Sequence, residues 1–129
     1  MILFLRTDSP ICLLTLQQDD GNRVEAVWQA DRQLAKGLLR HIEDFLGDND
    51  ANWNDLSGLV VFQGPGSFTG LRIGITVMNT VAYAQSIPVV GAVGEQWQDE
   101  GVARLEAGED DRIVVPEYGR EARITKPRK

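Results

Sequence analysis

The sequence is short of the residues that build metal and redox sites, with one cysteine and one histidine in 129 residues. A single cysteine excludes a disulfide within the chain, and one histidine cannot supply a histidine pair for a metal ion. Apolar runs are short as well: none is long enough to span a bilayer, and Arg6 interrupts the apolar stretch at the N-terminus. We therefore expect a cytoplasmic protein with no metal site, no signal peptide and no contact with a membrane.

The two scarce side chains are not expected in a catalytic site. Cys12 lies among Ile11, Leu13 and Leu14, which predicts a buried, unreactive thiol. His41 lies among charged residues of a predicted helix, with no serine, cysteine or second histidine nearby. An exposed helix position is therefore expected for His41.

Positive charge is also in the minority. The chain carries 13 lysine and arginine residues against 19 aspartate and glutamate residues, which gives a net charge of −6. This balance argues against strong nucleic-acid binding by the chain alone, so a role near nucleic acid would require a more basic partner. The hydrophobic content of 43% and the length are typical of one globular domain with a sizeable core.

The apolar segments that are present predict an α/β fold. The predicted strands lie at 2–5, 11–17, 23–28, 59–62, 87–91 and 112–116, and the predicted helices lie at 31–46 and 69–85. Turn signals between the first three strands indicate an antiparallel meander. The order β-β-β-α-β-α-β predicts a mixed sheet with helices packed on it.

The stretch at 63–74 is the most specific feature, because glycines and Pro65 separate an apolar strand from an apolar helix. A helix start can bind phosphate, but a P-loop needs a lysine after its last glycine, and here Leu71 follows Gly70. The spacing favours a turn that lets strand and helix pack closely. The alternative is a small nucleotide- or phosphate-binding module that uses the loop at 64–70, with Gly64, Gly66, Ser67 and Thr69.

The predicted helix at 69–85 is apolar on more than one side, so it should be buried on more than one side. A domain of this size cannot easily cover both sides, and we expect a second polypeptide to cover one of them. The apolar stripe of the helix at 31–46 would join the same interface. The predicted interface residues are Leu34, Leu38, Leu39 and Ile42 on the first helix and Leu71, Arg72, Ile75, Met78 and Ala82 on the second.

The loop and the start of the second helix, Gly-Pro-Gly-Ser-Phe-Thr-Gly-Leu-Arg-Ile-Gly at 64–74, resemble the signature of the TsaB (YeaZ) family. The similarity continues through the helix to Ile-Pro-Val-Val-Gly at 87–91. The resemblance implies a ribonuclease-H-like α/β fold, one half of an actin-like ATPase fold. It implies a non-catalytic scaffold subunit of the machinery that makes threonylcarbamoyladenosine (t6A) on tRNA. The signature loop would then comprise Gly64, Pro65, Gly66, Ser67, Phe68, Thr69 and Gly70.

The resemblance also implies partners. A TsaD-like catalytic subunit would pair with the chain through the two helices, and a TsaE-like ATPase would belong to the same machinery. The chain alone would form a homodimer, and tRNA would be contacted only indirectly. No cofactor is expected on this chain, because ATP would bind the wider complex. The sequence leaves open whether the working species is a homodimer or a heterodimer.

The chain departs from the family pattern in three places. Arg6 stands where the family usually has an aspartate at the end of the first strand, which reverses the charge at that position. Leu34 stands where family members often carry a histidine. The stretch between Gly91 and Pro116 is too short for the family's second lobe. We therefore expect a single TsaB-like lobe over 1–129, with an acidic loop that carries one helix at 92–111 and a basic tail at 120–129.

Enzymatic activity is not expected. A nuclease of the ribonuclease H type needs several carboxylates on adjacent strands to hold two metal ions, and the first strand offers Arg6 instead. A metallopeptidase needs a pair of histidines, and the sequence has one.

Overall fold

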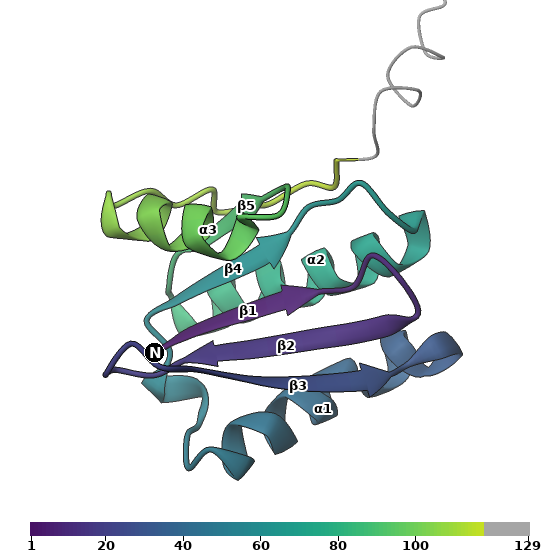
Figure 1. Cartoon of the computed structure of the whole chain (residues 1–129), viewed down its shortest axis with the longest axis horizontal. Coiled ribbons are helices and arrows are strands. Elements are labelled where there is room, and N and C mark those ends of the chain that lie inside the picture. The colour runs from purple at the N-terminus through teal and green to yellow at the C-terminus, as the bar shows by residue number, and fades with distance from the viewer. Residues whose placement is uncertain (118–129) are drawn as a thin grey trace, which may run out of the picture.

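The computed structural model describes residues 1–117, and the predicted basic tail at 120–129 lies outside the described residues. Within that range the chain forms one five-stranded sheet with helices on both faces (Figure 1). The strands are β1 (Ile2–Arg6), β2 (Ile11–Gln17), β3 (Arg23–Gln29), β4 (Gly58–Phe62) and β5 (Val89–Ala92). The helices are α1 (Leu34–Asp48), α2 (Phe68–Gln85) and α3 (Trp97–Glu106), with short 3-10 turns at η1 (Asp31–Gln33) and η2 (Trp53–Asp55).

The sheet is mixed, as the sequence predicts, with the order β3-β2-β1-β4-β5. The meander β1-β2-β3 is antiparallel, because the chain turns tightly after β2, where the Gln18 N–H donates to the Asn22 carbonyl. β4 and β5 add in parallel, since α1 and α2 carry the chain back across the sheet before each of them.

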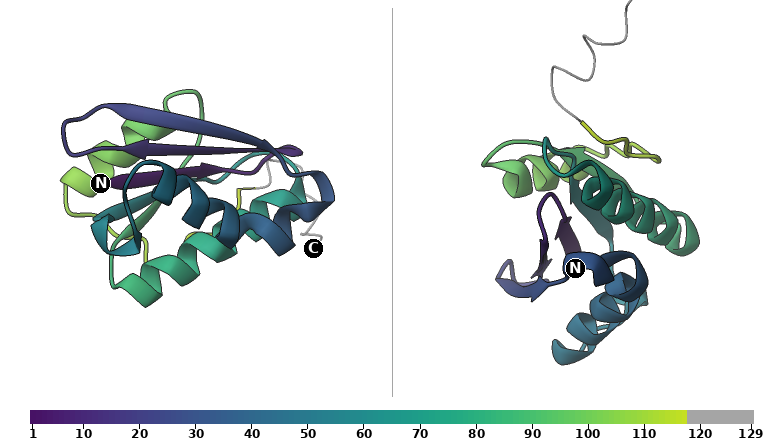
Figure 2. Two further views of the ribbon diagram at one scale, coloured as in Figure 1. Left: turned by 90° about the horizontal axis from the view of Figure 1, so that it is seen from below. Right: turned by 90° about the vertical axis from the view of Figure 1, so that its right-hand side faces the viewer.

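The central strand β1 has both faces covered. Its odd-numbered residues face α2. Thr7, which follows the strand and continues the same alternation, donates its hydroxyl to the Gly70 carbonyl of α2 at 2.7 Å. Its even residues face α3: the Phe4 ring meets the Trp97 ring edge-on, with centroids 6.1 Å apart. Trp97 is buried and also meets Phe62 edge-on, at 5.6 Å. The views in Figure 2 show α1 and α2 together on one face and α3 alone on the other.

α3 covers only part of its face. It packs on β4 and β5, and from there Gln98 donates to Thr15 of β2 and Asp99 pairs with Arg23 of β3. Ile11 and Val27 on these strands are 44% and 65% exposed. The stretch at 92–111, expected as an acidic loop with one helix, thus provides the helix that closes the core on the second face.

The strand predicted at 112–116 is wrong. Residues 110–117, which we call the strap, form an irregular segment, because Arg112 has a left-handed backbone (φ 65°) that cannot continue a strand. The edge of β5 is closed by side chains of the same region instead. Val89 N–H donates to the Asp110 carboxylate and Gly91 N–H to the Asp111 carboxylate, while Arg104 donates to the Gly91 carbonyl.

Among the described residues, no helix has the length and apolar character needed to cross a membrane.

Candidate functional site

The signature loop joins β4 to α2 and packs against the turn after β1. The Ser67 N–H donates to the Asp8 carbonyl at 2.9 Å, and a Cβ on Gly66 would collide with Asp8. A Cβ on Gly70 or Gly74 would collide with Thr7 in the same way. The glycines therefore allow close approach between helix and strand, which is the packing role that the loop spacing favours.

The start of α2 is capped from within the chain. Ser67 is the N-cap residue, and its hydroxyl accepts a bond from the Gly70 N–H, while the Leu71 N–H donates to the Ser67 carbonyl. A cavity of about 900 Å³ adjoins this helix start. Its lining includes Ser67, Thr69 and Gly70, together with Ser9, Pro10 and residues 29–35.

Arg6 occupies the end of β1 and binds the carboxylate that follows it. Its Nε and Nη2 donate to the two Asp8 carboxylate oxygens at 2.8 and 3.0 Å. The guanidinium carbon lies 3.9 Å from the centroid of the Phe62 ring. The Asp8 carboxylate is therefore held by a cation of the chain itself. Within residues 1–117 no cluster of three or more histidine, cysteine, aspartate or glutamate side chains could hold a metal ion.

Most of the predicted interface residues are wrong, because their side chains belong to the chain's own core. Leu34, Leu38, Ile42, Leu71, Ile75, Met78 and Ala82 are all buried within the described chain. One side of α2 packs on the sheet and the next side packs on α1, so the apolar surplus of α2 is covered internally. Of the predicted set, Leu39 and Arg72 are exposed.

The outward side of the helices carries Thr76, Thr80 and Tyr83, which the sequence analysis does not single out. On α2, polar residues recur at helical spacing and mark the side that faces water: Thr69, Arg72, Thr76 and Thr80. That spacing was the available signal. Large apolar side chains interrupt this side, with Phe68 52%, Tyr83 89% and, on α1, Leu39 51% exposed. We call Leu39, Phe68, Arg72, Thr76, Thr80 and Tyr83 the helix-pair surface.

A groove of about 410 Å³ runs along the helix-pair surface. It is lined by Ala35, Phe68, Thr69, Arg72, Ile73, Thr76 and Val77. The Arg72 guanidinium carbon lies 5.2 Å from the centroid of the Phe68 ring. The groove thus combines an aromatic ring, a cation and partly buried aliphatic side chains, a composition that is enriched at protein interfaces.

The single cysteine and the single histidine differ in burial. Cys12 is buried, as predicted, and burial raises the pKa of its thiol to about 12. His41 is half-buried rather than exposed, because its ring stacks on Trp28 with centroids 4.5 Å apart. Its Nε2 atom is buried and has no hydrogen-bond partner among the described residues.

One ion pair holds the end of α3 to the closed edge of β5. Arg104 donates to both carboxylate oxygens of Asp111, and its Nε donates to Glu109 at 2.7 Å. The hydrogen bonds from Arg104 to Asp111, with a further one from the Gly91 N–H, lower the pKa of Asp111 below its ordinary value.

The comparisons with known proteins agree with this fold. The family model for TsaD, tRNA N6-adenosine threonylcarbamoyltransferase, matches residues 28–93, which run from the end of β3 to just after β5. The tRNA threonylcarbamoyladenosine biosynthesis protein TsaB of Escherichia coli K12 is 29% identical over 119 residues, which cover 87% of this chain and 51% of that protein. TsaB of Bacillus subtilis 168 is 32% identical over 88 residues, covering 68% of this chain and 38% of that protein.

A solved structure, YeaZ from Pseudomonas aeruginosa, superposes with a TM-score of 0.68 at 27% identity, covering 83% of this chain and 49% of its own. The chain is therefore an α/β protein of the ribonuclease-H-like type, one half of an actin-like fold, as predicted. More narrowly, it belongs to the TsaB (YeaZ) family. The chain spans about half the length of the E. coli relative and of the solved structure, and less of the B. subtilis relative.

Proposed function

We propose that the chain is a non-catalytic scaffold subunit of the cytoplasmic machinery that makes t6A on tRNA, and that it pairs with a TsaD-like catalytic subunit through the helix-pair surface. Two relatives are named as t6A biosynthesis proteins, which supports the role. The TsaD family model covers both α1 and α2, so a TsaD-like partner would present a related pair of helices.

The observation that carries the pairing is the exposure of Leu39, Phe68 and Tyr83 on two adjacent helices. Exposed large apolar side chains scattered singly are ordinary, but these share one side of the molecule with a groove of about 410 Å³ and with Arg72. Aromatic and arginine side chains are the groups that most often dominate binding energy in interfaces.

A scaffold role is also supported by the Arg6–Asp8 pair. The Arg6 guanidinium lies at the end of β1 and donates to both oxygens of the Asp8 carboxylate, so this carboxylate is already held by a cation of the chain itself. Catalysis would then lie on the TsaD-like subunit. The proposal also includes a TsaE-like ATPase in the same machinery and contact with tRNA only through the complex. The chain alone would form a homodimer.

The test is calorimetric titration of the chain with the TsaD-like protein of the same organism. We expect Leu39→Asp and Tyr83→Asp each to weaken association at least about tenfold, because a charge would enter an apolar contact. Val27→Asp is the matched control, since Val27 is 65% exposed on the opposite face of the sheet. Unchanged melting temperatures would show that all three variants fold. Wild-type affinity in both helix variants, or no association by the wild-type chain, refutes the proposal.

The second candidate is the nucleotide- or phosphate-binding module. It is favoured by the cavity of about 900 Å³ at the start of α2, where a helix N-terminus favours anions. Calorimetry with ATP, with and without magnesium, tests it. Heat that saturates and is lost in Thr69→Val would support the module, and no heat at millimolar ATP would refute it.

A further inference from the structure

The strap is fixed to the body of the protein by side-chain amides. The Asn79 side chain of α2 donates to the Val114 carbonyl at 3.0 Å and accepts from the Val114 N–H at 2.9 Å. Gln63 donates to the Val115 carbonyl at 3.0 Å. This clamp buries the Val114 side chain, whereas Ile113 is 70% and Val115 61% exposed. The strap therefore presents apolar side chains outward from a fixed backbone.

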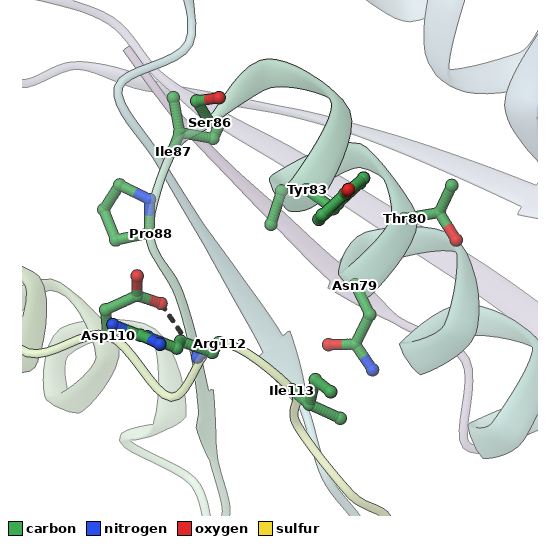
Figure 3. Close-up of a pocket in the computed structure, with 10 residues that line it drawn as sticks. Asn79, Thr80, Tyr83, Ser86, Ile87, Pro88, Asp110, Arg112 and Ile113 are labelled. Atoms are coloured by element: carbon green, nitrogen blue, oxygen red, sulfur yellow. Dashed lines mark hydrogen bonds between the residues drawn. The ribbon is translucent and has the colours of Figure 1, made fainter.

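A cavity of about 910 Å³ lies between the strap and the C-terminal half of α2 (Figure 3). We call it the strap groove. Its apolar lining comprises Ala82, Tyr83, Ile87, Pro88 and Ile113, and its polar lining comprises Asn79, Thr80, Ser86, Asp110 and Arg112.

Arg112 is held in place at the groove by an unusual backbone conformation. The Asp110 carboxylate accepts a bond from the Arg112 N–H at 2.8 Å, shown dashed in Figure 3, and supports the positive φ of that residue. A left-handed arginine costs free energy, and such outliers concentrate at sites of function.

The strap groove is continuous with the helix-pair surface. Helical spacing puts Arg72, Thr76, Thr80 and Tyr83 on one outward ridge of α2. The groove against α1 lies on one side of this ridge, and the strap groove lies on the other, with Thr80 and Tyr83 in its wall. A partner seated along the ridge would face both grooves.

The size of an ordinary interface also requires more than the two helices. A stable interface buries about 800 Å² on each partner and uses roughly 20–30 residues a side. Only 15 residues of α1 and α2 are exposed, and the adjoining strap adds further apolar side chains, among them Ile113.

Two arginines on this side can pair with a carboxylate of the partner, and Asp110 is the one acidic side chain among the described residues that line the strap groove. Arg6, Arg23 and Arg104 form ion pairs on or near the sheet. Arg72 and Arg112, in contrast, form none within residues 1–117. A carboxylate on the partner would pair with either guanidinium without displacing an existing ion pair.

We propose that the strap groove is a second contact site for the partner that binds the helix-pair surface. The partner places an apolar side chain between Tyr83 and Ile113 and a carboxylate against Arg112. The inference rests on the proposed function, because it takes its occupant, a TsaD-like subunit, from there.

The experiment is the same titration with the TsaD-like subunit, using Ile113→Asp and Arg112→Gly in the full chain. Both positions are exposed, and glycine suits the left-handed backbone at 112, so both variants should fold. We expect each to weaken association about tenfold, and we expect the affinity of Arg112→Gly to depend less on salt than that of the wild type. Val27→Asp on the opposite face is again the control.

The outcomes separate the two proposals. If Leu39→Asp weakens association while Ile113→Asp and Arg112→Gly bind like the wild type, the strap groove is not a contact site and the proposed function stands. If Arg112→Gly weakens association with an unchanged salt dependence, the carboxylate contact is refuted. If the wild-type chain does not associate, the proposed function and this inference both fail.

Discussion

Replacing Gly74 with alanine should destabilise the protein, although alanine is the better helix former. Gly74 lies inside α2, where the change would ordinarily gain up to about 1 kcal/mol. A Cβ at this position, however, would overlap the Thr7 hydroxyl and approach the Thr7 methyl carbon to 3.1 Å. Thr7 cannot easily move, because it is 1% exposed and its hydroxyl donates to the Gly70 carbonyl.

The size of the effect follows from these two opposing terms. Overpacking a fixed core site costs about 1–3 kcal/mol, so the net loss in the free energy of unfolding should be about 1–2 kcal/mol. For a domain of this length, that loss corresponds to a fall in melting temperature of very roughly 3–10 °C. Gly47→Ala in α1 is the matched control, because no atom lies within 4 Å of its added Cβ, and it should stabilise by about 0.5–1 kcal/mol.

Urea unfolding followed by circular dichroism measures both variants. A second background identifies the cause: Thr7→Ala removes the colliding hydroxyl and the methyl and leaves only the Cβ at 3.2 Å, so adding Gly74→Ala should cost much less there than in the wild type. Equal destabilisation by Gly74→Ala in both backgrounds would refute the packing role assigned to this glycine. So would stabilisation by Gly74→Ala in the wild-type background.

Three further outcomes are expected. Asp111→Asn should lower the free energy of unfolding by about 1–2 kcal/mol at pH 7, since it removes charged hydrogen bonds to Arg104. Because the folded pKa of Asp111 is lowered, its contribution is present above the unfolded pKa and is lost as the pH falls through the folded value. The variant should thus differ from the wild type at pH 7 and converge with it in acid; a constant difference down to pH 2 contradicts the lowered pKa. Cys12, whose thiol is buried with a pKa raised to about 12, should not react with a thiol reagent at pH 8 until the protein unfolds, and rapid native labelling contradicts its burial. Trp97→Ala should cost about 3–5 kcal/mol and release α3, visible as faster amide exchange in that helix, whereas Trp97→Phe should cost less; intact protection in Trp97→Ala contradicts the anchoring role.

The local pattern was enough to predict the mixed sheet and the two helices on its first face. Apolar runs and turn residues predict strands and turns from neighbouring residues alone. In the strap this local prediction fails. The apolar run at 112–116 predicts a strand. In the structure the Asp110 carboxylate accepts a hydrogen bond from the Arg112 N–H, and Arg112 has a left-handed backbone conformation that arginine rarely adopts. Nothing in the composition of that segment signals the conformation.

The predicted interface failed for a tertiary reason. The sequence predicts the apolar character of α2, but which side meets its own sheet and which meets α1 depends on the packing of distant segments. Leu71 and Met78 therefore belong to the core, while Tyr83, which the sequence did not single out, is the most exposed large apolar side chain described. The roles of Gly70 and Gly74 are likewise set by Thr7, more than sixty positions earlier in the chain.

The two edge strands of the sheet, β5 and β3, differ in whether their outer backbone groups are already hydrogen-bonded. This difference limits how copies of the chain could join by strand addition. At β5 the carboxylates of Asp110 and Asp111 and the guanidinium of Arg104 already occupy the amide and carbonyl groups that another strand would need. At β3 the described residues place no such barrier beyond the strand. Two copies that met along β3 would form a continuous sheet with sealed borders at both ends, so growth by this route would stop at a pair and could not propagate into a fibre.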